Sequence, residues 1–449
     1  MSSTPTLKRR HRQDLTLRKS FLDNVKTKFM SSISKLRENK TQQPCRIDSA
    51  SNYDMHDSFH NHNAHILHPS PSKRRKTSIV RQTTHHIGTL PPEILAHIFV
   101  LGSFADPHFP VTVSHVCRFW RHLSLRTPSL WRTIHLSNRT PALREKMLRA
   151  RACSLDIVIR EFPSRPFNFY EVQRYMCFAT AHLHRWRSLD IKISNYVPYL
   201  WNAALSECCS SHHSQAPTIE ELSLVYRRND DTKEFCLFSG YAPRLRRLTI
   251  DGLRLTWLPS LFCNLVYLDY THHPFSTGNQ AVNEIINALT VSSRLVELHL
   301  SYPTASNPRR NSRVASVAGK IRLSRLKTLS LRVESFDIPD ELIQVAAALF
   351  TPNLVNLDFV DSFGRYASVG ACRASFANLP MFLTLYSFPT SLRALRFDHR
   401  WYNEGIVPLL RPLVNLTTVV VRPEAGMDRI FYGSTKRRVK PRRQRVNCS

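Results

Sequence analysis

Glycine is scarce in this sequence, with 11 residues in a chain of 449. Phosphate-binding loops need clustered glycines, and no P-loop or nucleophile-elbow pattern occurs, so the common catalytic signatures are missing. No apolar run is long enough to span a bilayer, and the first thirty residues lack a signal-peptide core. The ten cysteines have no regular spacing, which favours reduced thiols. We therefore expect an intracellular, non-secreted, non-enzymatic protein of the nucleus or cytoplasm, with no cofactor, metal or membrane partner.

Acidic residues are also few, with 33 against 63 lysines and arginines, for a formal net charge of +30. The excess lies mainly at the two ends. About 17 basic and six acidic residues fall between Met1 and His86, and about seven basic residues follow from Lys436. We predict a disordered basic arm over residues 1–86 and a basic tail over residues 426–449, because neither buries enough apolar area to fold.

Two compact basic clusters lie in these ends. Their composition is typical of nuclear-import signals, although attraction to nucleic-acid phosphates or plain solubility would explain it too. The clusters comprise Lys73, Arg74, Arg75 and Lys76 in the arm, and Lys436, Arg437 and Arg438 in the tail.

One part of the arm has an apolar pattern. Apolar residues recur at helical spacing among lysines and arginines, at Leu22, Val25, Phe29, Ile33 and Leu36. The segment is either a transient basic helix or a helix that docks on a partner or an anionic membrane.

A six-residue pattern, apolar-x-x-apolar-x-apolar, recurs between residues 186 and 421. Alternate residues of a strand face one side, so the apolar positions point into a shared core. Helical patterns lie between copies, as in Ala281–Leu289 and Asp340–Phe350, and units of this kind must stack to bury their apolar faces. The copies are residues 186–191, 219–224, 245–250, 265–270, 295–300, 326–331, 354–359, 392–397 and 416–421.

This series predicts an α/β fold over residues 137–425, an irregular leucine-rich-repeat-like solenoid with parallel strands. The alternative is an ordinary α/β domain with amphipathic strands. Residues between the core positions face the open surface of the strands, where they either contact a target protein or are solvated. The candidates for target binding are Glu221, Arg247, Tyr267, His299, Arg332, Asp358 and Arg396.

Between the arm and the repeats, residues 87–136 have a compact helical pattern. "PPEILAHIF" begins a helix at two prolines, "GSFADPHFP" is expected to link it to the next, and Val113, Val116, Trp120 and Leu123 are spaced as a second amphipathic helix. Two tryptophans and many aliphatic residues exceed what so small a unit can bury. The surplus predicts a surface for a partner.

These residues resemble the F-box, through "LPPEI", "VCRFWR" and "PSLW". This version is similar to F-box proteins abundant in mushroom-forming fungi. The resemblance implies a small three-helix unit that docks on the Skp adaptor of a cullin ligase, while the downstream domain holds an unknown protein target. The link between the first two helices departs from the family pattern.

Carried over by position, eleven residues become candidates for adaptor contacts or their support. Several of them, Val116 and Trp131 in particular, could instead pack the helices together, and Cys117 is expected to be a small buried residue. The candidates are Leu90, Pro91, Ile94, Leu95, Ile98, Phe99, Val116, Cys117, Trp120, Leu130 and Trp131.

The function predicted from the sequence is a substrate receptor of an SCF-type cullin–RING ubiquitin ligase. One alternative is a nuclear nucleic-acid-associated or scaffold protein whose helical motif serves a different partner, although nucleic acid is the less expected ligand. Another is an F-box protein that binds the adaptor but works outside a ligase.

Overall fold

The computed structural model describes residues 87, 90–137, 140–161, 167–209, 214–303, 321–362, 375–422 and 429–432. Both basic clusters and the amphipathic arm segment lie outside these residues. Internal contacts divide the chain into two units, residues 1–130 and residues 131–449, which are described separately. No helix in the described ranges combines the length and the apolar character needed to cross a bilayer.

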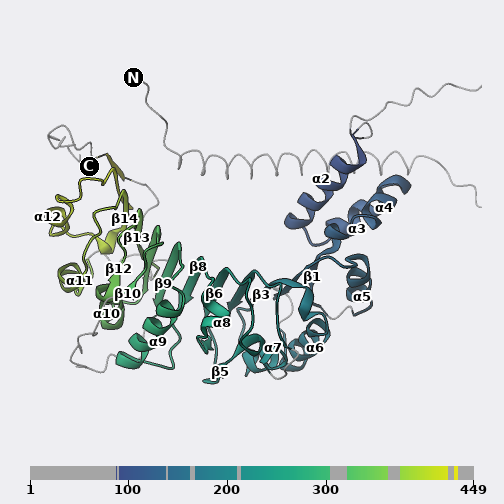
Figure 1. Cartoon of the computed structure of the whole chain (residues 1–449), viewed down its shortest axis with the longest axis horizontal. Helices are drawn as coiled ribbons and strands as arrows, with labels where there is room; N and C mark the ends of the chain where they lie inside the picture. The colour runs from purple at the N-terminus through teal and green to yellow at the C-terminus, as the bar shows by residue number, and fades with distance from the viewer. Residues whose placement is uncertain are drawn as a thin grey trace, which may run out of the picture. The chain divides into compact units, whose positions relative to one another are not determined.

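The described part of the first unit is helical. Pro92 is the first residue of its first helix, where no intrahelical partner for a backbone N–H is lost. Three helices and a 3-10 turn follow one another (Figure 1): α2 (Pro92–Ala105), α3 (Phe109–Ser114), α4 (Arg118–Leu125) and η2 (Pro128–Trp131), the last of which ends at the division between the units.

Two boundaries differ from the sequence prediction. The residues "GSFA" do not belong to a link, because α2 continues through Ala105 and only three residues separate it from α3. The second amphipathic helix is in fact two helices, because the backbone at Cys117 is extended, with φ −154° and ψ 172°. The apolar residues keep one helical spacing across α3 and α4, so the sequence pattern gives no sign of this break.

The second unit is built on a 12-stranded sheet in which neighbouring strands are parallel, apart from an antiparallel last pair. The order along the sheet follows the order in the chain (Figure 1). The strands are β1 (Thr133–His135), β2 (Leu155–Arg160), β3 (Trp186–Lys192), β4 (Glu221–Val225), β6 (Arg247–Asp251), β8 (Tyr267–Thr271), β9 (Glu297–Pro303), β11 (Thr328–Glu334), β13 (Asn356–Asp361), β14 (Ala394–Asp398), β15 (Thr418–Arg422) and β16 (Arg429–Tyr432).

Each of the nine predicted hexamers overlaps a strand of this sheet, and the register aligns their core positions. The fourth positions pair across it from Leu189 through Leu222, Leu248 and Leu268 to Val419. The same local turn precedes most strands, since the first leucine donates its N–H to the carbonyl three residues earlier. The prediction of a mixed fold with a parallel sheet is therefore confirmed, whereas β1, β2 and β16 lay outside the pattern.

Helices connect the strands and cover one face of the sheet (Figure 1). The pattern at Ala281–Leu289 is confirmed as helical, while that at Asp340–Phe350 ends early because Leu349 and Phe350 form a strand. The connecting helices are α5 (Thr140–Arg149), α6 (Phe169–Thr180), α7 (Leu200–Cys209), α8 (Pro259–Phe262), α9 (Gly278–Val291), α10 (Asp340–Ala348), α11 (Leu379–Leu385) and α12 (Ile406–Leu410).

Short elements complete the connections. Two small parallel sheets pair β5 (Glu234–Phe235) with β7 (Arg254–Leu255) and β10 (Ile321–Arg322) with β12 (Leu349–Phe350). The remaining 3-10 turns are η3 (Leu183–Arg185), η4 (Leu237–Gly240) and η6 (His399–Trp401).

Candidate functional site

The helical unit has a small aromatic core. Leu95 and Phe99 on α2 are fully buried, and the Phe99 ring lies 5.0 Å from Trp120 and 6.4 Å from Phe109, centroid to centroid. Leu130 is buried as well. These contacts fix α2 against α3 and α4, so the positions of all other side chains on α2 follow from them.

Gly102 allows α2 and α3 to approach. A Cβ atom at this position would lie 2.4 Å from a carbon of the Phe109 ring, far inside van der Waals contact. Phe109 is itself buried, so the ring has little room to move away. The glycine therefore serves close packing, although it costs about 1 kcal/mol of helix propensity relative to alanine.

Cys117 is not the small buried residue that the sequence suggested. It is exposed, and its Sγ accepts a hydrogen bond from the backbone N–H of Trp120 at 3.4 Å, capping the start of α4. The extended backbone and the side-chain acceptor are the two features of a helix N-cap, so Cys117 has a capping role here.

The helical unit also carries apolar side chains that its own core does not bury. Ile94, Leu101 and Phe104 on α2 are 51%, 41% and 58% exposed. Ile94, Ile98 and Leu101 are spaced i, i+4, i+7, so they form a stripe beside the buried face, and Ile98 is half-buried. Val111 on α3 and Phe119 on α4 are exposed too. We call Ile94, Ile98, Leu101 and Phe104 the α2 stripe.

The candidate adaptor residues therefore fall into two groups. Leu95, Phe99, Trp120, Leu130 and Trp131 are buried, in the position of structural support. The remaining candidates are exposed or half-buried: Leu90, Pro91, Ile94, Ile98, Val116 and Cys117.

The sequence prediction omitted the exposed Leu101, Phe104, Val111 and Phe119. The i, i+7 spacing from Ile94 to Leu101 could have indicated the first of these.

The open face of the sheet carries the candidate target residues, in three different rows. Glu221, Arg247 and Tyr267 are in register with one another. His299, Asp358 and Arg396 align with a second row, and Arg332 belongs to a third. The sequence placed them on one face without distinguishing their positions along the strands.

Ionic and aromatic contacts link these residues across the strands. Arg247 lies 3.7 Å from Glu221 and stacks over Tyr267 at 4.1 Å. Arg332 contacts His299 at 2.9 Å and Asp269 at 3.2 Å, and Arg396 lies 3.5 Å from Asp358. The carboxylates lie deep, with Asp269 and Asp358 each less than a fifth exposed, and the guanidinium groups cover them. Much of the charge on this face is thus neutralised internally.

Arg227, which follows β4, forms ion pairs with residues at the ends of two other strands. Its Nε donates to Asp251 at 2.7 Å and its two terminal nitrogens donate to Glu334 at 2.7 and 2.9 Å. Glu334 ends β11, four strands along the sheet from β4. In a flat sheet four strand spacings would be about 19 Å, beyond the reach of these two side chains. The carboxyl ends of the strands therefore curve toward one another.

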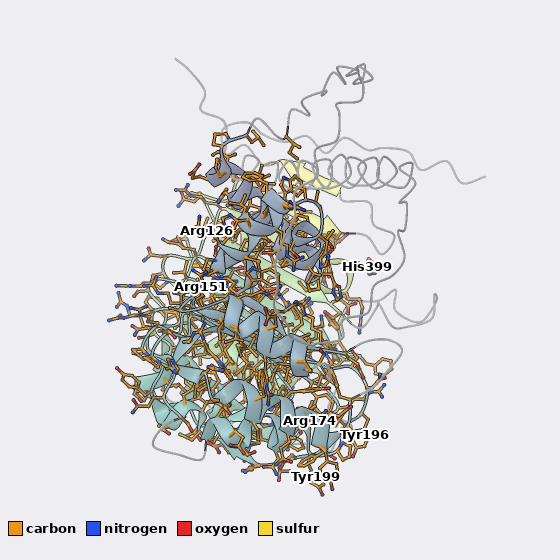
Figure 2. All side chains as sticks on the ribbon, turned by 90° about the vertical axis from the view of Figure 1, so that its right-hand side faces the viewer. Arg126, Arg151, Arg174, Tyr196, Tyr199 and His399 are labelled. Atoms are coloured by element: carbon orange, nitrogen blue, oxygen red, sulfur yellow. The ribbon has the colours of Figure 1, made fainter. Side chains whose placement is uncertain are left out.

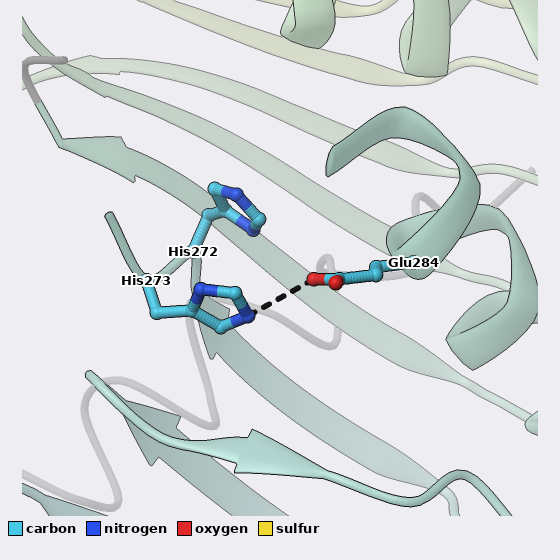
Figure 3. Close-up of side chains that lie close together, drawn as sticks. All are labelled: His272, His273 and Glu284. Atoms are coloured by element: carbon cyan, nitrogen blue, oxygen red, sulfur yellow. Dashed lines mark ion pairs between the residues drawn. The ribbon is translucent and has the colours of Figure 1, made fainter. Parts of the chain in front are cut away.

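Three side chains that could ligate a metal meet after β8: His272, His273 and Glu284 (Figure 3). Their ligand atoms lie within 4.8 Å of one another. In the structure, hydrogen bonds occupy these atoms. His273 Nδ1 accepts from Phe275 N–H, so its Nε2 carries the proton and donates to Glu284 at 3.0 Å. The cluster is therefore a hydrogen-bond network.

His272 completes this network and is held neutral. Its Nε2 donates to the Ser276 carbonyl at 3.0 Å, which leaves Nδ1 to accept from the Tyr270 hydroxyl. Burial lowers the pKa of His272 to about 4. Burial disfavours the Glu284 carboxylate, but hydrogen bonds from His273 and Ser276 and the nearby Arg254 outweigh that cost and lower its pKa to about 2.

Comparison with protein families adds one finding. Residues 87–137 match the family model described as F-box-like. The match covers the described helices α2 to α4 and the turn η2, so this region is similar to the F-box-like family, which supports the F-box prediction made for it from the sequence. No curated protein matches the chain.

Proposed function

We propose that this protein is the substrate receptor of an SCF-type cullin–RING ubiquitin ligase. The F-box-like domain would bind the Skp adaptor, and the strand unit would bind a target protein. The observation that carries the proposal is the α2 stripe, because apolar side chains left exposed within a domain of this family are what an adaptor would cover.

The α2 stripe gives a shorter list of direct adaptor contacts than the sequence prediction did. Ile94, Ile98, Leu101 and Phe104 would touch the adaptor directly, with Phe119 at the margin. Buried Leu95, Phe99 and Trp120 would act by holding α2 in place. Binding energy would come mainly from removing these apolar side chains from water, at about 25 cal/mol per Å² of apolar surface.

The mechanism would be proximity without catalysis by this chain. One end would be fixed to the ligase while the strand unit holds a target lysine near the activated ubiquitin, which raises its effective concentration. Parallel strands in chain order, most of them preceded by the same turn, support a leucine-rich-repeat-like solenoid for this unit. We propose further that the F-box is of the fungal type and that the protein acts in the nucleus or cytoplasm. The two basic clusters would direct its import into the nucleus.

The nucleic-acid alternative has less support. Arginines on the described part of the open face largely pair with deep carboxylates, as Arg332 does with Asp269. A phosphate-binding surface needs several uncompensated cations in a row.

Copurification with the Skp adaptor tests the proposal. The full chain with Ile94→Asp and Leu101→Asp should lose the adaptor, because charges replace apolar contacts. The control carries Leu148→Asp and Val414→Asp, which change two exposed apolar residues of the strand unit, and should retain it. Equal melting temperatures would show that both variants are folded. Retention of the adaptor by the first variant would contradict the proposal.

A further inference from the structure

A pocket opens in the strand unit between the small sheet of β5 and β7, the end of β8 and helix α9. Its volume is about 200 Å³, below the roughly 300–1,000 Å³ of sites for drug-sized ligands. It therefore has room for one side chain or a molecule of similar size. The exposed Glu234 and Asn287 line it together with the buried Tyr270 and His273, so the pocket runs inward from the surface.

The ionisable groups that line this pocket leave one negative charge unbalanced. Its two carboxylates, Glu234 and Glu284, face one guanidinium, that of Arg254, which lies 3.8 Å from the first and 3.2 Å from the second. His273 adds no charge, because its Nδ1 accepts from the Phe275 N–H while its Nε2 proton is donated to Glu284 (Figure 3). The pKa of Glu284, about 2, keeps that carboxylate charged at neutral pH.

The cations around the pocket do not cancel this charge from within it. Lys233, next to Glu234 in the chain, is not among the lining residues, and its ammonium donates to Asn202 on α7 at 3.0 Å. Exposed arginines of the strand unit, such as Arg151 and Arg174 (Figure 2), add to a formal net charge of +30 for the whole chain. The molecule as a whole therefore repels cations, so binding of a cation would report the pocket.

The polar groups of the pocket that lack a partner offer oxygen acceptors. The two oxygens of Glu284 already accept hydrogen bonds from four side chains. Among the described residues, Glu234 has only Arg254 nearby, at 3.8 Å and beyond hydrogen-bond distance, and the side chains of Thr256 and Asn287 form no hydrogen bond. A primary ammonium has three N–H donors and no acceptor, so it matches these three side chains.

Trp257 gives the pocket an aromatic wall. Its half-buried ring lies 4.7 Å from Phe262 and 6.1 Å from Tyr270, centroid to centroid, and these contacts hold its orientation. Tryptophan is the side chain whose ring face attracts cations most strongly, and the neighbouring Leu255 adds apolar surface. A ligand with a cationic head and a short alkyl chain therefore finds a partner for each part.

We propose that this pocket binds a primary alkylammonium group, either the side chain of a lysine in a bound protein or a free aliphatic amine. Glu234 accepts one N–H of the ammonium, and Thr256 and Asn287 accept the others. Trp257 lies against the ligand. The surplus carboxylate charge disfavours an anion in the same place. The inference goes beyond the receptor role and does not depend on it.

Ligand-observed NMR with n-butylammonium and the full chain, at pH 7 and physiological ionic strength, tests the proposal. Saturation transfer to the butyl chain should reveal binding with a dissociation constant on the order of 1 mM, as suits so small a probe. 1-Butanol, which lacks the charge, and n-butyltrimethylammonium, which lacks the N–H donors, should each bind about tenfold more weakly. Binding of either compound as tightly as the primary amine would overturn the proposal.

Variants then locate the site. Glu234→Gln should weaken binding of n-butylammonium about tenfold, whereas Glu404→Gln, the same charge change at an exposed position outside the pocket, should leave it unchanged. Trp257→Leu should weaken it about threefold. Melting temperatures show whether each variant is folded, and the exposed Glu234 decides if the tryptophan variant is destabilised. Equal affinities of the two glutamine variants would contradict the proposed site.

A blocked glycine-rich peptide with a single lysine separates the two sources of the ammonium group. Displacement of n-butylammonium by this peptide would assign the pocket to a lysine of a bound protein. Binding of n-butylammonium without displacement by the peptide would assign it to a free amine. The assay contains no adaptor, so its failure is distinguishable from failure of the ligase assignment.

Discussion

The helical unit and the strand unit differ in how their surface side chains are arranged, although both leave some large apolar residues exposed. In the helical unit, large apolar side chains such as Ile94 and Phe104 remain at the surface beside a complete core. In the strand unit, the leucines of the recurring pattern are buried and the open face satisfies many charges by pairing. The difference teaches that exposed apolar side chains repeated along one helix, more than exposed apolar residues as such, identify the proposed docking face.

The largest expected effect distinguishes core from stripe on one helix. Phe99→Ala removes a fully buried ring that contacts Trp120 and Phe109, and should cost about 3–5 kcal/mol of unfolding free energy in the helical unit. Leu101→Ala, two residues later and 41% exposed, should cost less than about 1 kcal/mol. Chemical denaturation of each variant measures both. Similar losses of unfolding free energy in the two variants would contradict the assignment of Phe99 to the core and Leu101 to the surface.

Acidification should destabilise the strand unit selectively. His272 titrates near 6.5 when unfolded and at about 4 when folded, so the unfolded chain binds the proton first as pH falls. On the order of 3 kcal/mol should be lost between pH 6.5 and pH 4, and Glu284 adds a loss below its ordinary value of 4.5. Melting temperatures across this range check it. His272→Gln should flatten the dependence, and an unchanged slope would exclude the histidine as its source.

Gly102→Ala tests the close approach of α2 and α3. Overpacking against the Phe109 ring should cost about 1–3 kcal/mol, while the gain in helix propensity returns at most about 1 kcal/mol. A net destabilisation is therefore expected in a thermal melt of the variant. A variant more stable than the wild type would show that the Phe109 ring moves away from the added methyl group at little cost.

The smallest effect is expected on the open face. Arg247 and Glu221 are both about half exposed and 3.7 Å apart, so solvent screens their attraction. Arg247→Ala should change the unfolding free energy by less than about 1 kcal/mol. A larger loss in denaturant titration would mean that stacking on Tyr267 contributes more than surface position suggests.

Periodicity predicted the repeated strands well because each hexamer carries its own core pattern, from Leu189 to Val419. It missed β1, which has three residues, and β2, where Ser154 occupies the position of the first apolar residue of the pattern. The site was predicted less well. The type of a residue does not show whether its side chain is buried against another helix. The sequence therefore did not distinguish the buried Phe99 from the exposed Phe104.

Hydrogen exchange of the full chain, with and without the Skp adaptor, tests the central claim most directly. The account predicts slower exchange of backbone amides in α2 when the adaptor is added, strongest near Ile94 to Leu101, with the strand unit unchanged. Unaltered exchange along α2 under saturating adaptor, or protection confined to the strand unit, would contradict it.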